Sequence, residues 1–208
     1  MYLCVRMGLY ALVALATVLP WPSLAFASCR SQFKALVHRN VNIGAYEIMD
    51  NNVQTDKRDG KTIEVNSLLQ VAFPASARLK MEFLPLNFTT DVVEIGSKTW
   101  VYADKKWTSV AYNAGAVALA AIRKNGFITG SYRNLECLGL QRNDGINALV
   151  FRYTAVVSGI DMPITLYIDA ATRLPVKGEG HAETAIFVGH LTTHYRFGPQ
   201  IKIEPPSF

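Results

Sequence analysis

The stretch DMPITLYIDAATRLPVKGEG, residues 161–180, contains two strand patterns separated by a turn. Apolar residues alternate with others up to Asp169, Ala-Ala-Thr-Arg at 170–173 interrupts the alternation, and a second run begins at Leu174-Pro175. An aspartate carboxylate commonly accepts a hydrogen bond from the backbone N–H two residues further on, so we expect Asp169 to start the turn. Pro175 has no N–H to donate and fits a bend or a sheet edge. The stretch therefore predicts antiparallel strands joined by a tight turn.

Similar strand patterns follow one another along most of the chain. Leu79, Met81 and Phe83 alternate with charged residues, which predicts a sheet with one apolar and one polar face. The predicted strand segments are 45–56, 61–73, 78–88, 89–110, 131–142, 146–157, 162–182 and 185–198, with a last short piece at 200–206. Long strands joined by short turns such as KRDGK at 57–61 predict a strongly curved sheet, because flat sheets of this size are unusual.

Two segments have helical patterns. Phe33, Leu36 and Val37 have helical spacing within 28–42, which predicts a short N-terminal helix. The alanine-rich segment 111–127 ends at Asn-Gly, an expected helix stop, and is apolar on nearly all sides. A helix of that kind must be covered, so we expect it to pack in the concave face of the sheet.

Residues 1–27 have the features of an export signal. Arg6 lies in the n-region, residues 9–19 form an apolar h-region, and Ala25–Ala27 complete an Ala-x-Ala cleavage site. The apolar run is too short to span a bilayer of about 30 Å, which favours cleavage over a retained anchor. The remainder, 28–208, has no internal repeat or linker and predicts a single domain.

Cysteine use agrees with export. Cys4 lies in the signal, so the mature chain keeps Cys29 and Cys137. Two cysteines in an oxidising compartment predict one disulfide. In the alternative, FASC at 26–29 is a degenerate lipobox and Cys29 carries a lipid anchor, but this leaves Cys137 unpaired.

The charge distribution excludes one class of partner. The formal net charge is +5, but the basic residues are scattered and form no arginine-rich run. Such a pattern gives no nucleic-acid footprint. A transient attraction to anionic membrane surfaces is compatible with it.

Three segments together resemble a known superfamily. They are GSKTWVYADKKW at 96–107, LYIDAATRLP at 166–175 and YRFGPQIKIEPP at 195–206. In order and spacing they are similar to the periplasmic lipoprotein-carrier superfamily, the LolA-like and LppX-like proteins. The resemblance implies a periplasmic α+β protein, mainly β, whose strongly curved antiparallel sheet forms a half-barrel closed by the N-terminal and alanine-rich helices. It also implies that the protein holds a lipid chain or another hydrophobic ligand.

A set of large apolar residues at alternating strand positions is the expected lining of that ligand site. The set is Leu79, Met81, Phe83, Val93, Ile95, Trp100, Tyr102, Leu149, Phe151 and Tyr153. For any single member, ordinary core packing is the better interpretation. Together they favour a carrier or binding protein for a hydrophobic molecule, and the alternative is an envelope protein-interaction or sensor module without ligand transport.

Catalytic and metal sites are weakly indicated. A general-acid role for Asp169 would need a base or second carboxylate nearby, for which Glu179 and Glu183 are only guesses. His190 and His194 are four residues apart, but HExxH zinc sites use that spacing on a helix and with a glutamate. The local pattern here is a strand, whose polar face should carry both histidines. We therefore expect no enzyme activity, no metal and no cofactor.

Overall fold

The computed structural model describes residues 28–39, 44–111, 131–157 and 160–207. It contains one helix, α1 (Cys29–Arg39), and eleven strands within these ranges. The strands are β1 (Ala45–Asp56), β2 (Thr62–Ala72), β3 (Ser76–Leu84), β4 (Phe88–Ile95), β5 (Lys98–Ala103), β6 (Lys106–Val110), β7 (Ser131–Asn143), β8 (Ile146–Val157), β9 (Ile160–Asp169), β10 (Pro175–Glu183) and β11 (Phe187–Phe197). The predicted export signal and all but the first residue of the alanine-rich segment lie outside the described residues.

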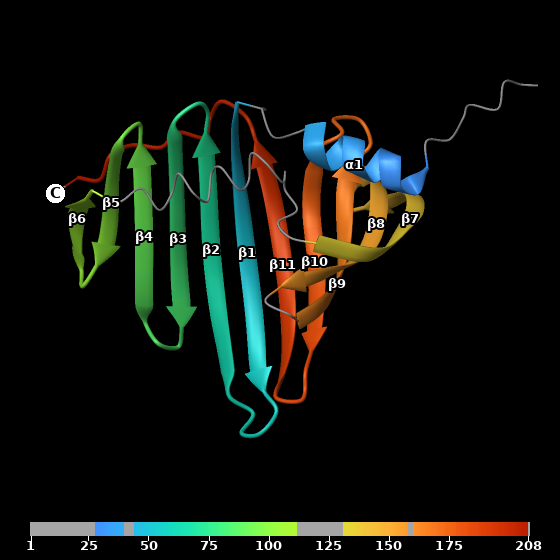
Figure 1. Cartoon of the computed structure of the whole chain (residues 1–208), viewed down its shortest axis with the longest axis horizontal. Coiled ribbons are helices and arrows are strands. Elements are labelled where there is room, and N and C mark those ends of the chain that lie inside the picture. Colours follow the sequence, from blue (N-terminus) through green and yellow to red (C-terminus); the bar gives the residue numbers. More distant parts are fainter. Residues whose placement is uncertain (1–27, 40–43, 112–130, 158–159, 208) are drawn as a thin grey trace, which may run out of the picture.

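All eleven strands form one antiparallel sheet in the order β6-β5-β4-β3-β2-β1-β11-β10-β9-β8-β7. Each half is a meander of sequential hairpins, and the two halves meet where β1 pairs with β11, with Tyr46 opposite Phe197. At the β7 end the sheet curls over its neighbouring strands, on the side that carries α1 (Figure 1). The sheet is curved and open, which confirms the predicted half-barrel.

Successive side chains of a strand point to opposite faces, and directly paired residues share a face, so the register divides the sheet into two faces. The inner face is the one against which α1 packs. On it, Phe33, Leu36 and Val37 of α1 form a buried cluster with side chains of β8 and β9. A second cluster, built on Tyr46 with Val71 and Ala77, lies on the same face of β1–β3. Both buried clusters therefore lie on the inner face.

The predicted disulfide is present. Cys29, the first residue of α1, is bonded to Cys137 on β7, and the two positions are 108 residues apart in the sequence. A sulfur held in this bond cannot carry a lipid, so the lipid-anchor alternative does not fit the structure. The disulfide ties the start of α1 to the curved end of the sheet.

The last short piece, 200–206, does not pair as a strand. Pro205 and Pro206 have no N–H to give to a ladder. Lys202, Glu204, Pro205, Pro206 and Ser207 instead line a pocket on the outer face together with Arg78, Val93 and Trp107. The C-terminal segment therefore lies over part of the outer face (Figure 1).

Candidate functional site

Asp169 has the structural role predicted for it. Its Oδ1 accepts a hydrogen bond from the backbone N–H of Ala171 at 2.9 Å, and its Oδ2 accepts one from the Thr172 hydroxyl at 2.9 Å. These bonds stabilise the ionised form and hold the pKa of the Asp169 carboxyl below its ordinary value, the Ala171 N–H having the larger effect. The carboxylate is occupied by its own turn, which agrees with a structural role.

Replacing Asp169 by alanine is expected to lower the free energy of unfolding by about 1 kcal/mol at neutral pH, because the turn loses both side-chain hydrogen bonds. A lowered folded-state pKa means that the stabilisation is complete above the ordinary value of 3.8 and is lost as the pH falls through the folded-state pKa. Urea unfolding of wild type and variant at neutral and acidic pH measures this difference. Asp169→Asn is the control, since it keeps an acceptor and removes the titration. A wild-type advantage that does not change with pH would contradict the assignment.

The register divides the ten predicted lining residues between the two faces. Leu79, Met81 and Phe83 on β3 lie on the inner face, as do Leu149, Phe151 and Tyr153 on β8. Four others lie on the outer face, so the expectation of a single shared face is wrong for them: Val93, Ile95, Trp100 and Tyr102.

The alternating pattern assigned residues of β4 and β5 to the wrong face because both faces of these strands carry apolar side chains. Val92 and Val93 are neighbours that point to opposite faces, and Val101 points inward between Trp100 and Tyr102. On the outer face, Val93 of β4 and Trp107 of β6 line a pocket together with residues of the C-terminal segment.

The six inner-face residues have different surroundings. Phe151 and Tyr153 are buried beneath α1, and Leu149 packs against the same cluster, so these three belong to the core. Burial also raises the pKa of the Tyr153 hydroxyl. The three β3 residues are only half-buried. The candidate site is therefore displaced from α1 toward the β1–β4 half.

Other half-buried apolar side chains share the inner face with the β3 residues. Val65 on β2 is directly opposite Phe83, and Leu191 on β11 lies beside Met162, because both would contact a Cβ added at Gly180. We call the following residues the inner-face set: Val65, Leu79, Met81, Phe83, Met162 and Leu191. Among the described residues, none of this set belongs to either buried core cluster. The alternation of Ile63, Val65, Leu69 and Val71 in the sequence could have identified the contribution of β2.

The inner face also carries carboxylates. Asp50 on β1 accepts hydrogen bonds from the hydroxyl of Thr193 at 2.6 Å and from that of Ser67 at 3.2 Å. Glu94 on β4 is 4% exposed, and its Oε2 has no hydrogen-bond partner in the described part of the chain.

The histidines lie on the outer face, as predicted. His190 and His194 share that face of β11 with Arg196, and all three are exposed. His190 contacts His181 of β10, with 3.4 Å between their Nδ1 atoms. Within the described ranges, no group of three or more His, Cys, Asp or Glu side chains is placed to hold a metal ion. The same ranges contain no helix with the length and apolar character needed to cross a membrane.

The outer face is hollowed near its centre. A groove of about 320 Å³ lies over β1, β2 and β3. Its floor includes Met49 and Leu68, and polar side chains surround it, among them Lys80, Glu82 and His194. The outer face thus has a polar-rimmed recess, whereas the inner face has the larger apolar set.

Comparison with known proteins places the fold. No family model matches the sequence, and no curated protein matches it. Among solved structures, LprF from Mycobacterium bovis superposes with a TM-score of 0.53 at 12% identity, over 86% of this chain and 97% of LprF. The lipoprotein LppX from Mycobacterium tuberculosis gives a TM-score of 0.49 at 12% identity, over 85% and 98% of the two chains. A LolA superfamily protein from Nitrosomonas europaea gives 0.35 at 12% identity, over 83% and 94%. The likeness to LprF confirms the predicted fold.

Proposed function

We propose that this protein is an exported, periplasmic binding protein or carrier for a lipid, an acyl chain or another hydrophobic molecule. The observation that carries the proposal is the inner-face set, six half-buried apolar side chains on the curved side of an open sheet. The resemblance of the sequence to the lipoprotein-carrier superfamily supports the same ligand class.

The inner-face set would supply binding energy without specific polar contacts. Transfer of each CH₂ group from water to an apolar site is favourable by about 0.8 kcal/mol, so a chain of about a dozen carbons could bind tightly. The described part of the inner face already buries its core residues under α1, which leaves the β2–β3 and β9–β11 side chains to contact a ligand. No catalytic step is part of this proposal.

Met81→Gln tests the site. We expect the affinity for a fluorescent fatty acid to fall about tenfold, because an amide must be desolvated where the thioether contacted the chain. Met49→Gln is a matched control, since Met49 is also half-buried but faces outward from β1. Displacement titrations of the fluorescent probe measure both variants, and native mass spectrometry of the purified wild type shows any ligand that remains bound. Failure of the wild type to bind any probe, with no bound ligand by mass, would refute the function.

A second function is supported by the outer groove. An envelope interaction or sensor module would bind a protein segment there, with Met49 and Leu68 as apolar contacts and Lys80, Glu82 and His194 as polar ones. Under this alternative Met49→Gln, and not Met81→Gln, would reduce binding of the protein partner. The same pair of variants therefore separates the two functions.

A further inference from the structure

Exposed apolar side chains gather at one end of the sheet. Six large apolar side chains of the described residues are exposed, and five of them lie at the end formed by the β1–β2, β3–β4 and β10–β11 turns. We call these five the apolar rim: Ile63, Leu84, Leu86, Phe88 and Ile186. Their exposed fractions range from 42% to 65%. The sixth, Leu140, is on the edge strand β7.

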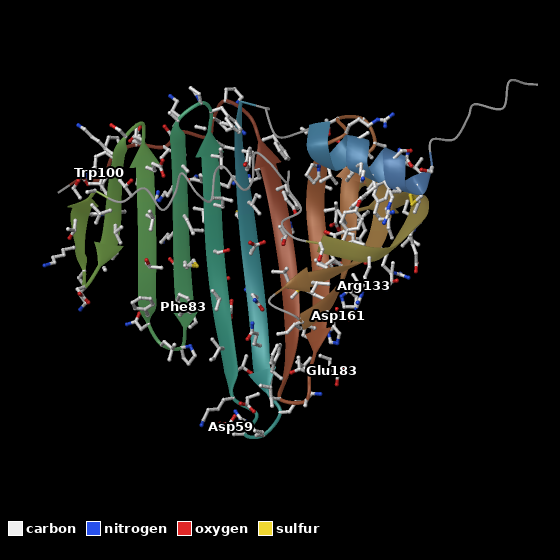
Figure 2. The ribbon with its side chains drawn as sticks, viewed as in Figure 1. Asp59, Phe83, Trp100, Arg133, Asp161 and Glu183 are labelled. Atoms are coloured by element: carbon white, nitrogen blue, oxygen red, sulfur yellow. A yellow bond between two sulfur atoms is a disulfide. The ribbon has the colours of Figure 1, made fainter. Side chains whose placement is uncertain are left out.

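The topology brings these turns together. Alternate turns of a meander lie at the same end of a sheet, and the β1–β11 pairing adds the β10–β11 turn to that end. The backbone N–H of Lys57 donates to the carbonyl of Ile186 at 2.8 Å, which joins two of the turns directly. Figure 1 shows the three turns at the lower end, and Asp59, Phe83 and Glu183 mark that end in Figure 2.

The apolar rim is continuous with the inner-face set. Val65, Phe83 and Phe88 are directly opposite one another on adjacent strands and point inward. The Phe83 and Phe88 rings are 5.6 Å apart between centroids. An apolar path therefore runs from the exposed Phe88 to Phe83 and then to Met81 on the inner face.

The charged side chains of this end are paired. Lys57 bonds Glu183 at 2.7 Å, Arg58 bonds Asp56 at 2.5 Å, and Lys61 bonds Asp59 at 2.7 Å. Three cations thus balance three anions on the β1–β2 and β10–β11 turns. These two turns therefore carry no excess of either charge, and Glu64, which is opposite Leu84, accepts hydrogen bonds from the side chains of Asn51 and Asn66.

We propose that the apolar rim docks on the surface of a lipid bilayer. Its residues lie in or next to three separate turns at the end of the sheet, an arrangement suited to insertion between lipid headgroups. The balanced charges match a zwitterionic headgroup layer, and the Phe88–Phe83–Met81 path leads from that layer to the inner face. The docking stands on the rim itself, whereas the passage of a ligand along this path rests on the proposed function.

Vesicle flotation with the full mature chain tests the docking. We expect wild type to bind vesicles of phosphatidylcholine, with little change when phosphatidylglycerol is added or the salt concentration is raised. The double variant Leu86→Ser, Ile186→Ser should lower the partition coefficient at least about tenfold, because two exposed apolar side chains no longer insert. Leu140→Ser, which removes an equally exposed leucine from another part of the sheet, should leave it unchanged.

Three results would overturn the docking: no vesicle binding by wild type, an equal loss in Leu140→Ser, or binding that requires the anionic lipid. Concentration-dependent dimerisation abolished by the rim variant would also overturn it, by assigning the rim to a contact between copies. Probe displacement without vesicles should be unchanged in the rim variant. If the wild-type protein binds the fluorescent probe but not vesicles, only the docking is refuted. If it binds vesicles but not the probe, only the proposed function is refuted.

Discussion

Phe33→Ala is expected to lower the free energy of unfolding by about 3–5 kcal/mol, the usual range when a fully buried aromatic residue is truncated. Phe33 is 1% exposed and anchors α1 to the inner face. Its ring centroid lies 5.2 Å from that of Tyr132, 5.1 Å from that of Phe151 and 5.4 Å from that of Tyr153. Removal of the ring leaves a cavity under a short helix and breaks all three aromatic contacts. Urea unfolding followed by near-ultraviolet circular dichroism measures the loss.

Phe88→Ala is the matched control for this variant. Phe88 has a single aromatic contact, with Phe83, among the described residues and is exposed in the apolar rim. Truncation there should change stability by less than about 1 kcal/mol. Equal effects of the two substitutions would contradict the placement of α1 as the main cover of the β7–β9 region.

Loss of the disulfide is the second large effect that we expect. The bond between Cys29 and Cys137 closes a long loop, for which chain entropy alone gives about 4–5 kcal/mol, and measured losses are usually about 2–5 kcal/mol. The double variant Cys29→Ser, Cys137→Ser should unfold at correspondingly lower urea concentration. Reductant should shift the wild-type midpoint by a similar amount.

The same reductant should have no effect on the double variant, which makes that variant its own control. A wild-type transition that is insensitive to reductant, or an intact mass equal to that of the fully reduced chain, would contradict the disulfide. Because Cys29 and Phe33 fix the same helix, the losses from the two changes should not add. A combined variant that loses less than the sum would show that both act through α1.

The sequence was sufficient to predict the elements of the fold. The strands at 45–56 and 146–157 were predicted with the bounds observed, because the polar turns at 57–61 and 144–145 end the first and begin the second. The disulfide and the Asp169 turn were also predicted, since each depends on local chemistry or on the number of cysteines. These features need no knowledge of which face of a strand is covered.

The faces of β4 and β5 could not be predicted in the same way. Trp100 and Tyr102 alternate as inward residues would, but the register places both on the outer face, where the Tyr102 ring contacts Trp107. Sequence periodicity indicates that one face of a strand is covered, but it does not identify which face of the sheet that is. The apolar rim was missed for a related reason, because Leu84 and Leu86 continue an apolar run whose exposure is decided by the β3–β4 turn.

The pairing of β1 with β11 has a consequence for the order in which the sheet can form. The central ladder joins residue 46 to residue 197, so the middle of the sheet cannot form until nearly the whole chain is available. Contacts between such distant residues slow folding, because loop closure must precede the gain from pairing. If the chain is exported as proposed, it can stay unfolded while it passes through an export channel and completes its sheet only after β11 has crossed. The placement of the C-terminal strand at the centre of the sheet would thus couple native structure to the end of translocation.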